Sequence, residues 1–214
     1  PHYEQVATGR VRDALVAGLR YVRGAPQVRS ILIRTGAFSV AASSLPALLP
    51  ILARPHGATG YGLLLGFFGL GALAGAAVLP RVRNRFSVNG LVAFDILLFA
   101  TMTFAAGRVQ TFSLLCLVLF AGGTAWIGIL ACLNIAAQTM CPSFLRARAL
   151  SMYLLVLQGG MALGSATWGA LATRVGVPTA LMYSAIVLVL GLLAVRRHRL
   201  SSQQMELTPS VVRD

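Results

Sequence analysis

The chain has very few residues that favour contact with water. Only 11% of its 214 residues are charged, whereas soluble domains usually carry about 25%. It contains five acidic residues and no lysine, so all 18 basic residues are arginines. This shortage of charge excludes an ordinary soluble domain, because too little polar surface is present to cover an apolar core.

Residues that hold metals or form disulfides are also scarce. The three cysteines, Cys116, Cys132 and Cys141, lie in or beside one apolar segment without the spacing of metal ligands. The sequence therefore predicts no metal site, no cofactor and no disulfide framework. It also lacks the HExxH motif, the paired intramembrane carboxylates and the Ser/His sets that would indicate an enzyme embedded in the membrane.

What the chain has in abundance is apolar sequence, with 57% hydrophobic residues and a mean hydropathy of +0.78. The clearest run extends from Tyr61 to Pro80 without a charge and ends in three closely spaced arginines. About 20 apolar helical residues cross a bilayer core roughly 30 Å thick, so this run predicts a membrane span. Its glycines, among them Gly71 and Gly75, would let another backbone approach closely.

Further apolar runs predict an all-α membrane protein with six transmembrane helices. The predicted spans cover residues 30–53, 61–79, 88–106, 111–133, 149–171 and 179–195. Residues 1–29 are expected to form a cytoplasmic amphipathic linker helix, because apolar residues at spacings of three and four make one helical stripe. Residues 196–214 are polar, and we expect a cytoplasmic tail without fixed structure.

The arginines alternate along the chain in a way that predicts its orientation. Fourteen lie in stretches that would face the cytoplasm, whereas the outer turns carry only Arg54, Arg108 and Arg174. Because cytoplasmic loops are enriched in basic residues, we expect both ends inside a plasma membrane, with a bacterial inner membrane favoured. Because the arginines cluster in these turns, we expect the net charge of +13 to interact with anionic headgroups of the lipid bilayer. No nucleic acid is expected as a partner.

Two charged residues fall inside the predicted spans. Asp95 is the only acid in any span, and an isolated carboxylate in hydrocarbon must be protonated, paired or facing a cavity. It is a candidate proton relay; alternatively, it pairs with Arg83 or Arg146 and locks helices together. Arg34 is a candidate substrate or relay cation, but its shallow position favours snorkelling to the cytoplasmic surface.

Side chains near mid-depth are candidates for contact with cargo. Pro46 and Pro50 would bend the first span, which suits a wall that moves. Trp126 in the fourth span either packs or lines a cavity, with packing favoured. Gln158 in the fifth span either joins helices or touches cargo. The cavity candidates are Ser43, Phe67, Trp126, Gln158 and Met161.

One loop resembles a motif of the major facilitator superfamily. In that superfamily the loop between the second and third helices of each half carries a Gly-xxx-Asp-Arg-x-Gly-Arg-Arg type motif. Here Gly75-Ala-Ala-Val-Leu-Pro-Arg-Val-Arg-Asn-Arg85 occupies that place, with Leu79 where the acid would be and Val82 where the second glycine would be. The candidate gating-loop residues are Gly75, Arg81, Arg83 and Arg85.

Two longer stretches are similar to the enterobactin-exporter-like branch of that superfamily, the transmembrane secretion effectors. They are RVRDALVAGLRYVRGAPQVRSILIRTGAF at 10–38 and PSFLRARALSMYLLVLQGGMALGSATWGALATRVG at 142–176. The resemblance implies the C-terminal half of a transporter, built from two inverted three-helix repeats and partnered by an N-terminal six-helix half. The absence of a starting methionine is expected for the later part of a longer protein.

The resemblance also implies a function. It implies a proton-coupled exporter of small amphipathic molecules, such as drugs or siderophores, that works by alternating access. The first, second, fourth and fifth spans would line the cavity, and the third and sixth would face lipid. In that arrangement Asp95 would lock helices, and the proton carrier would lie in the other half. A non-transporting membrane scaffold or assembly subunit is the alternative.

Overall fold

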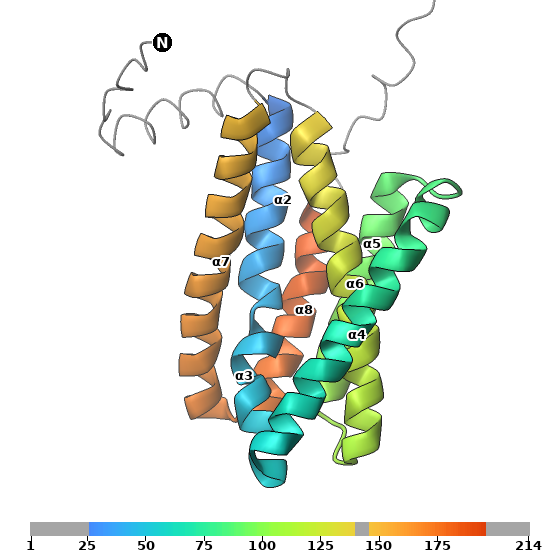
Figure 1. Cartoon of the computed structure of the whole chain (residues 1–214). Helices are drawn as coiled ribbons and strands as arrows, with labels where there is room; N and C mark the ends of the chain where they lie inside the picture. The colour runs from blue at the N-terminus through green and yellow to red at the C-terminus, as the bar shows by residue number, and fades with distance from the viewer. Residues whose placement is uncertain (1–25, 140–145, 196–214) are drawn as a thin grey trace, which may run out of the picture.

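In the computed structural model, which describes residues 26–139 and 146–195, the regular structure is helical (Figure 1). Most of the predicted linker helix at 1–29, the loop at 140–145 and the tail at 196–214 lie outside the described residues. The helices are α2 (Pro26–Ala42), α3 (Ser44–Leu52), the short 3-10 helix η1 (Arg54–His56), α4 (Gly57–Arg83), α5 (Val88–Ala106), α6 (Phe112–Thr139), α7 (Arg146–Val175) and α8 (Val177–Val195).

Helices α2 and α3 form one broken rod. Backbone hydrogen bonds from Ser43 N to Ser39 O and from Ala47 N to Ser43 O continue the helix across the break. Pro46 follows three residues after Ser43 and has no N–H with which to bond the carbonyl of Ala42. The break therefore occurs where the prolines of the first span predict a bend.

Five segments of the described chain are long and apolar enough to cross a membrane, and the first, Ile31–Arg83, covers 53 residues. As one helix it would be about 80 Å long, far more than a bilayer core of roughly 30 Å. The chain instead reverses around η1 and Gly57, whose φ is +67°, and α4 runs back in the opposite direction (Figure 1). The described helices thus make six rods, and the prediction of an all-α membrane fold is confirmed.

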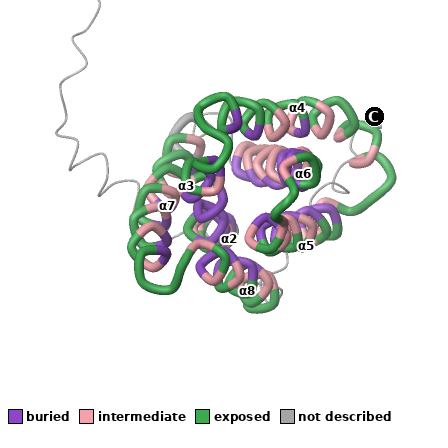
Figure 2. Tube along the Cα trace, turned by 90° about the horizontal axis from the view of Figure 1, so that it is seen from below, coloured by how far each residue is buried: buried purple, intermediate pink, exposed green. Residues whose placement is uncertain are grey.

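Along the chain the rods form two successive groups of three, α2–α5 and α6–α8, and the largest contacts join rods of different groups. Helix α6 packs on α4 and α5, the broken α2–α3 rod packs on α7 and α8, and α5 packs against α8 (Figure 2). The first rod of each group therefore contacts the second and third of the other. Because α2 and α6 also run in opposite directions (Figure 1), the packing follows the pattern of two inverted three-helix repeats.

Glycines bring α4 close to α6. A Cβ added at Gly71 would overlap the carbonyl of Phe120, and one at Gly75 would lie 2.9 Å from the carbonyl oxygen of Thr124. Phe120 and Thr124 are one turn apart on α6, so its backbone fits along the glycine face of α4. Such close approach needs small residues, because lipid offers helices no hydrophobic driving force to associate and van der Waals contact must hold them.

Helix α7 repeats this contact on the α2–α3 rod. A Cβ at Gly160 would overlap the hydroxyl of Ser39, and one at Gly164 would overlap both the hydroxyl of Ser43 and the carbonyl of Val40. The spacing of four residues between the glycines is the same as in α4. The two glycine pairs of the sequence therefore make equivalent contacts, each between the second rod of one group and the first rod of the other.

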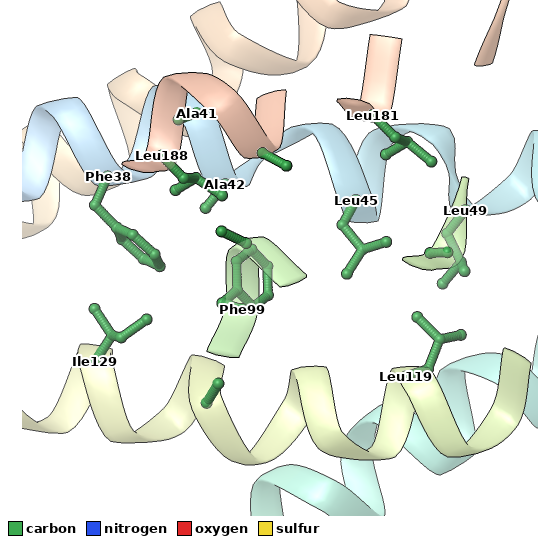
Figure 3. Packing of buried hydrophobic residues seen from close by; sticks show 14 of the residues in the cluster. Phe38, Ala41, Ala42, Leu45, Leu49, Phe99, Leu119, Ile129, Leu181 and Leu188 are labelled. Atoms are coloured by element: carbon green, nitrogen blue, oxygen red, sulfur yellow. The ribbon is translucent and has the colours of Figure 1, made fainter. Parts of the chain in front are cut away.

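Apolar side chains fill the space between the rods. Figure 3 shows Phe38 and Leu45 of the broken rod, Phe99 of α5 and Ile129 of α6 directed into this common core. Phe99 is fully enclosed, with 0% of its surface exposed. The large apolar side chains outside the core are exposed on the bundle surface, as expected for a protein that faces lipid.

The change Gly71→Ala tests the close contact between α4 and α6. Overpacking usually costs about 1–3 kcal/mol, so we expect a lower midpoint of thermal unfolding in detergent. Gly66→Ala on the same helix is the matched control, because nothing lies within 4 Å of a Cβ at Gly66. Alanine favours helices more than glycine, so the control should keep or raise the midpoint. Equal losses in both variants would contradict the contact.

Candidate functional site

One face of the bundle is bordered by α4 and α7. Helix α4 packs along α6 and α7 along α2–α3, but α4 and α7 do not pack extensively on each other. The two central rods, α2–α3 and α6, lie between them, whereas α5 and α8 lie together on another side (Figure 2). The predicted cavity-lining spans are thus the four rods that share the α4–α7 side.

Two predicted cargo residues lie together on α7. Gln158 is exposed and Met161, one turn further along, is half-buried. Met161 lies beside the stripe of Gly160 and Gly164 that packs on the broken rod, whereas Gln158 lies on the other side of α7, because positions two apart in a helix differ by about 200°. The structure leaves the third candidate on the bordering helices, Phe67 of α4, half-buried against the main core. Gln158 is thus the cavity candidate whose amide is open to a ligand.

The structure places Ser43 inside a helix contact. Its side chain is fully buried, its hydroxyl donates to the carbonyl oxygen of Val40 at 2.9 Å, and it adjoins Gly164 of α7. A buried hydroxyl with its hydrogen used in this way has little left to offer a ligand. Its position favours a role in the break of the rod.

Trp126 lies in a cluster of aromatic rings. The centroid of its ring is 5.5 Å from those of both Phe38 and Phe99, and 6.3 Å from that of Phe68. These residues come from the broken rod, α5, α4 and α6, so the cluster joins four helices at one point. Aromatic pairs at such distances contribute about 0.5–1.5 kcal/mol each, which agrees with the preference for packing at this position.

Two side chains from α7 and α8 bond carbonyl groups beside the break in the rod. The indole N–H of Trp168 donates to the carbonyl oxygen of Val40 at 2.8 Å. The hydroxyl of Ser184 donates to that of Ala41 at 2.8 Å and lies 2.6 Å from the hydroxyl of Ser44. Carbonyl groups near a helix break in a membrane need such partners, because lipid provides none. The break is therefore held by the two neighbouring helices.

Asp95 lies on α5 at the contact with α6. Its side chain is buried, with 7% of its surface exposed, and its Oδ2 atom has no hydrogen-bond partner. The carboxylate fits over Gly128 of α6, where a Cβ would overlap it. Within the described residues it makes no ion pair with Arg83, and the side chain of Arg146 lies outside them. The carboxylate of Asp95 thus fills the niche on α6 that is left free because Gly128 has no side chain.

Arg34 is directed into the bundle. Its guanidinium donates to the side-chain oxygen of Asn89, at the start of α5, at 3.3 Å, and the side chain is half-buried. This contact ties α2 to α5, so Arg34 has a protein partner where snorkelling to the surface was favoured. Among the described contacts, none joins the side chain of Arg34 to that of Asp95.

The gating-loop candidates are divided between packing and surface. Gly75 contributes to the α4–α6 contact described above. Arg81 is exposed and donates to the carbonyl oxygen of Ala77 at 3.3 Å, Arg83 is half-buried, and Arg85 is exposed in the turn after α4. Helix α4 continues through Pro80 to Arg83, beyond the predicted span. The arginines thus surround the end of α4 without converging on one group.

Several residues that the sequence did not single out take part in these contacts. Trp168, Ser184, Gly128 and Asn89 each pair with a predicted feature: the proline break, Asp95 or Arg34. A usable signal existed for Trp168, since a buried indole N–H normally finds an acceptor. For metal binding, the described chain holds no group of three or more His, Cys, Asp or Glu side chains that could form a site.

Comparison with known protein families gives a single finding. A family model described as transmembrane secretion effector matches residues 2–212, nearly the entire chain. None of the curated proteins matches the chain. The matched range includes both groups of three helices and every contact described above.

The change Trp168→Phe tests how the break is held. It keeps an aromatic ring but removes the donor to Val40, so we expect a loss of about 0.5–1.5 kcal/mol in stability. Hydrogen exchange at the amides of residues 43, 44, 45 and 47 should also become faster. Trp126→Phe is the control, because it removes an indole from the aromatic cluster without touching the break. Unchanged exchange in the Trp168 variant would contradict this role.

A double-mutant cycle tests the niche of Asp95. Gly128→Ala should destabilise the protein by about 1–3 kcal/mol, because the new methyl group overlaps the carboxylate. In an Asp95→Ala background the methyl group has room, so the cost should fall by about 0.5–3 kcal/mol, the usual coupling of residues in contact. An Asp95→Asn background keeps the bulk and should keep the cost. Equal costs in all three backgrounds would rule out the contact.

Proposed function

Because this chain belongs to the transmembrane secretion effector family of the major facilitator superfamily, we propose that it is half of a proton-coupled exporter of small amphipathic molecules. The family match over residues 2–212 carries this proposal, and the packing of two three-helix groups supports it. Drugs and siderophores are the cargo class that the resemblance implies. The protein would lie in a plasma membrane with both ends of this segment in the cytoplasm.

The proposed mechanism is alternating access. Two halves of a transporter rock around a site near the middle of the membrane, so each half must move largely as a rigid body. The glycine contacts of α4 with α6 and of α7 with α2–α3 join the rods of this half closely. The break at Ser43 then provides a place where the first rod can bend without separating from α7 and α8.

A second six-helix half would cover the face between α4 and α7. On α4 the glycines Gly62, Gly66 and Gly69 are exposed, and on α7 Gly159 is half-buried; nothing lies within 4 Å of a Cβ added at any of them. Exposed glycines at helical spacing suit the approach of further membrane helices. This arrangement leaves α5 and α8 toward lipid, as expected for the third and sixth spans.

Gln158 is the residue that we propose to contact cargo, with Met161 and Phe67 supplying apolar surface. Amphipathic cargo needs a mostly apolar wall with few polar groups to orient it. Arg34 bonds Asn89 and Asp95 lies against α6, so both support the packing of α5 in this proposal. The coupling proton would then be carried by the other half.

Transport by cells or proteoliposomes containing the protein together with its N-terminal half tests the proposal. Dye efflux should depend on a proton gradient and disappear with an uncoupler. Gln158→Ala should reduce efflux or drug tolerance roughly 2- to 10-fold, the effect of one hydrogen bond. Thr173→Ala is the matched control, because Thr173 is exposed on the last turns of the same helix and donates to its own backbone.

Each failure has a separate meaning. An intact, correctly assembled protein that moves no dye at any gradient would favour a membrane scaffold. Efflux that is normal in both variants would leave transport standing and remove Gln158 from the cargo site. Efflux that does not depend on the proton gradient would exclude proton coupling but leave the rest of the proposal standing.

A further inference from the structure

A cavity of about 570 Å³ lies at the end of the bundle opposite to Arg81 and Arg85. It is formed where the turn between α5 and α6 meets the last residue of α3 and the first turns of α8. Its polar lining comes from Arg108, Gln110 and Thr179, and Arg108 is the one charged residue in it. The cavity belongs to the α5–α8 side, away from the face proposed to contact cargo.

Arg108 is held at this cavity by apolar contacts. Its guanidinium carbon lies 5.4 Å from the centroid of the Phe104 ring, and its Nη2 atom is 3.9 Å from the sulfur of Met182. A ring face and a thioether, a weak acceptor, leave most of the donors of a guanidinium available. In the described part of the chain no carboxylate pairs with Arg108. The site thus offers a positioned cation with free hydrogen-bond donors.

Exposed apolar stripes run from this cavity along both helices that border it. On α5 the stripe lies at spacings of three and four residues, and on α8 the spacing is the same. Phe104 and Leu97 are each 42% exposed, and on α8 Ile186 is 48% and Leu190 57% exposed. The full stripes are Phe94, Leu97, Thr101, Phe104 and Arg108 on α5, and Tyr183, Ile186, Leu190 and Leu193 on α8.

The length of the α8 stripe matches one leaflet of a bilayer. Leu193 lies ten positions after Tyr183, or about 15 Å along the helix. Half of a hydrocarbon core of roughly 30 Å is about 15 Å. An arginine at the cavity and an apolar stripe of this length together present a headgroup site above a surface for acyl chains.

We propose that this cavity binds the headgroup phosphate of an anionic phospholipid from the leaflet at that end, with the acyl chains along the stripes of α5 and α8. Arg108 pairs with the phosphate, and Gln110 and Thr179 supply hydrogen bonds to headgroup oxygens. Guanidinium groups suit phosphate because their planar donors match its oxygens. The site depends on residence in a membrane and not on the transport proposed above.

Lipid retention by the purified full chain tests the site. Protein in detergent is mixed with phosphatidylglycerol or with phosphatidylcholine of the same chains, and bound lipid is counted by native mass spectrometry. The wild type should retain phosphatidylglycerol preferentially, and Arg108→Gln should reduce this preference about fivefold, the effect of one arginine near an anionic headgroup. Arg54→Gln and Arg174→Gln are the controls, since both arginines are exposed at the same end but do not line the cavity.

A second variant separates the cavity from its charge. Thr179→Trp keeps Arg108 but fills the space beside it, so it too should lose the bound phosphatidylglycerol. Equal losses in the Arg108, Arg54 and Arg174 variants would overturn the proposal, because they would indicate general charge attraction. Equal retention of the two lipids by the wild type would do the same. If millimolar inorganic phosphate displaced phosphatidylglycerol, the site would be one for a soluble anion. That result would overturn the proposal that it binds a lipid.

Discussion

The fold depends on the close approach of helix backbones at glycine. In a membrane, lipid chains are as apolar as leucine, so two helices gain little from burying leucine against each other. What remains is van der Waals contact, which needs surfaces that fit without a gap. Gly71 and Gly75 against α6, and Gly160 and Gly164 against the broken rod, provide that fit twice. The rods that carry the candidate site are positioned by these two contacts.

The broken rod meets a different constraint of the membrane. A proline removes a donor from a helix and leaves backbone acceptors that lipid cannot satisfy. Trp168 and Ser184 bond the carbonyls of Val40 and Ala41, so the break is preserved by contacts with α7 and α8. The bend in the rod is thus tied to both neighbouring helices.

The two charged side chains inside the bundle each lie against a residue of a neighbouring helix. Arg34 bonds Asn89 on α5, and Asp95 occupies the space that Gly128 leaves on α6. Both contacts join α5 to the central rods, which places these residues in the packing of the bundle and not on its α4–α7 face. The opposite end of α5 carries Arg108, which lines a cavity. Each of the three charges thus contacts at least one residue from a different helix.

The sequence by itself determined the all-helical membrane fold, because spans of about 20 apolar residues and arginine-rich turns are properties of short stretches of chain. It also indicated the glycine pairs and the bend at Pro46, since both arise from the residue types alone. Only the tertiary structure decided that Ser43 and Trp126 lie in packed contacts, that Asp95 lies over Gly128, and that Trp168 reaches Val40. These contacts join residues from different helices, and helical periodicity does not specify which helix a face will meet.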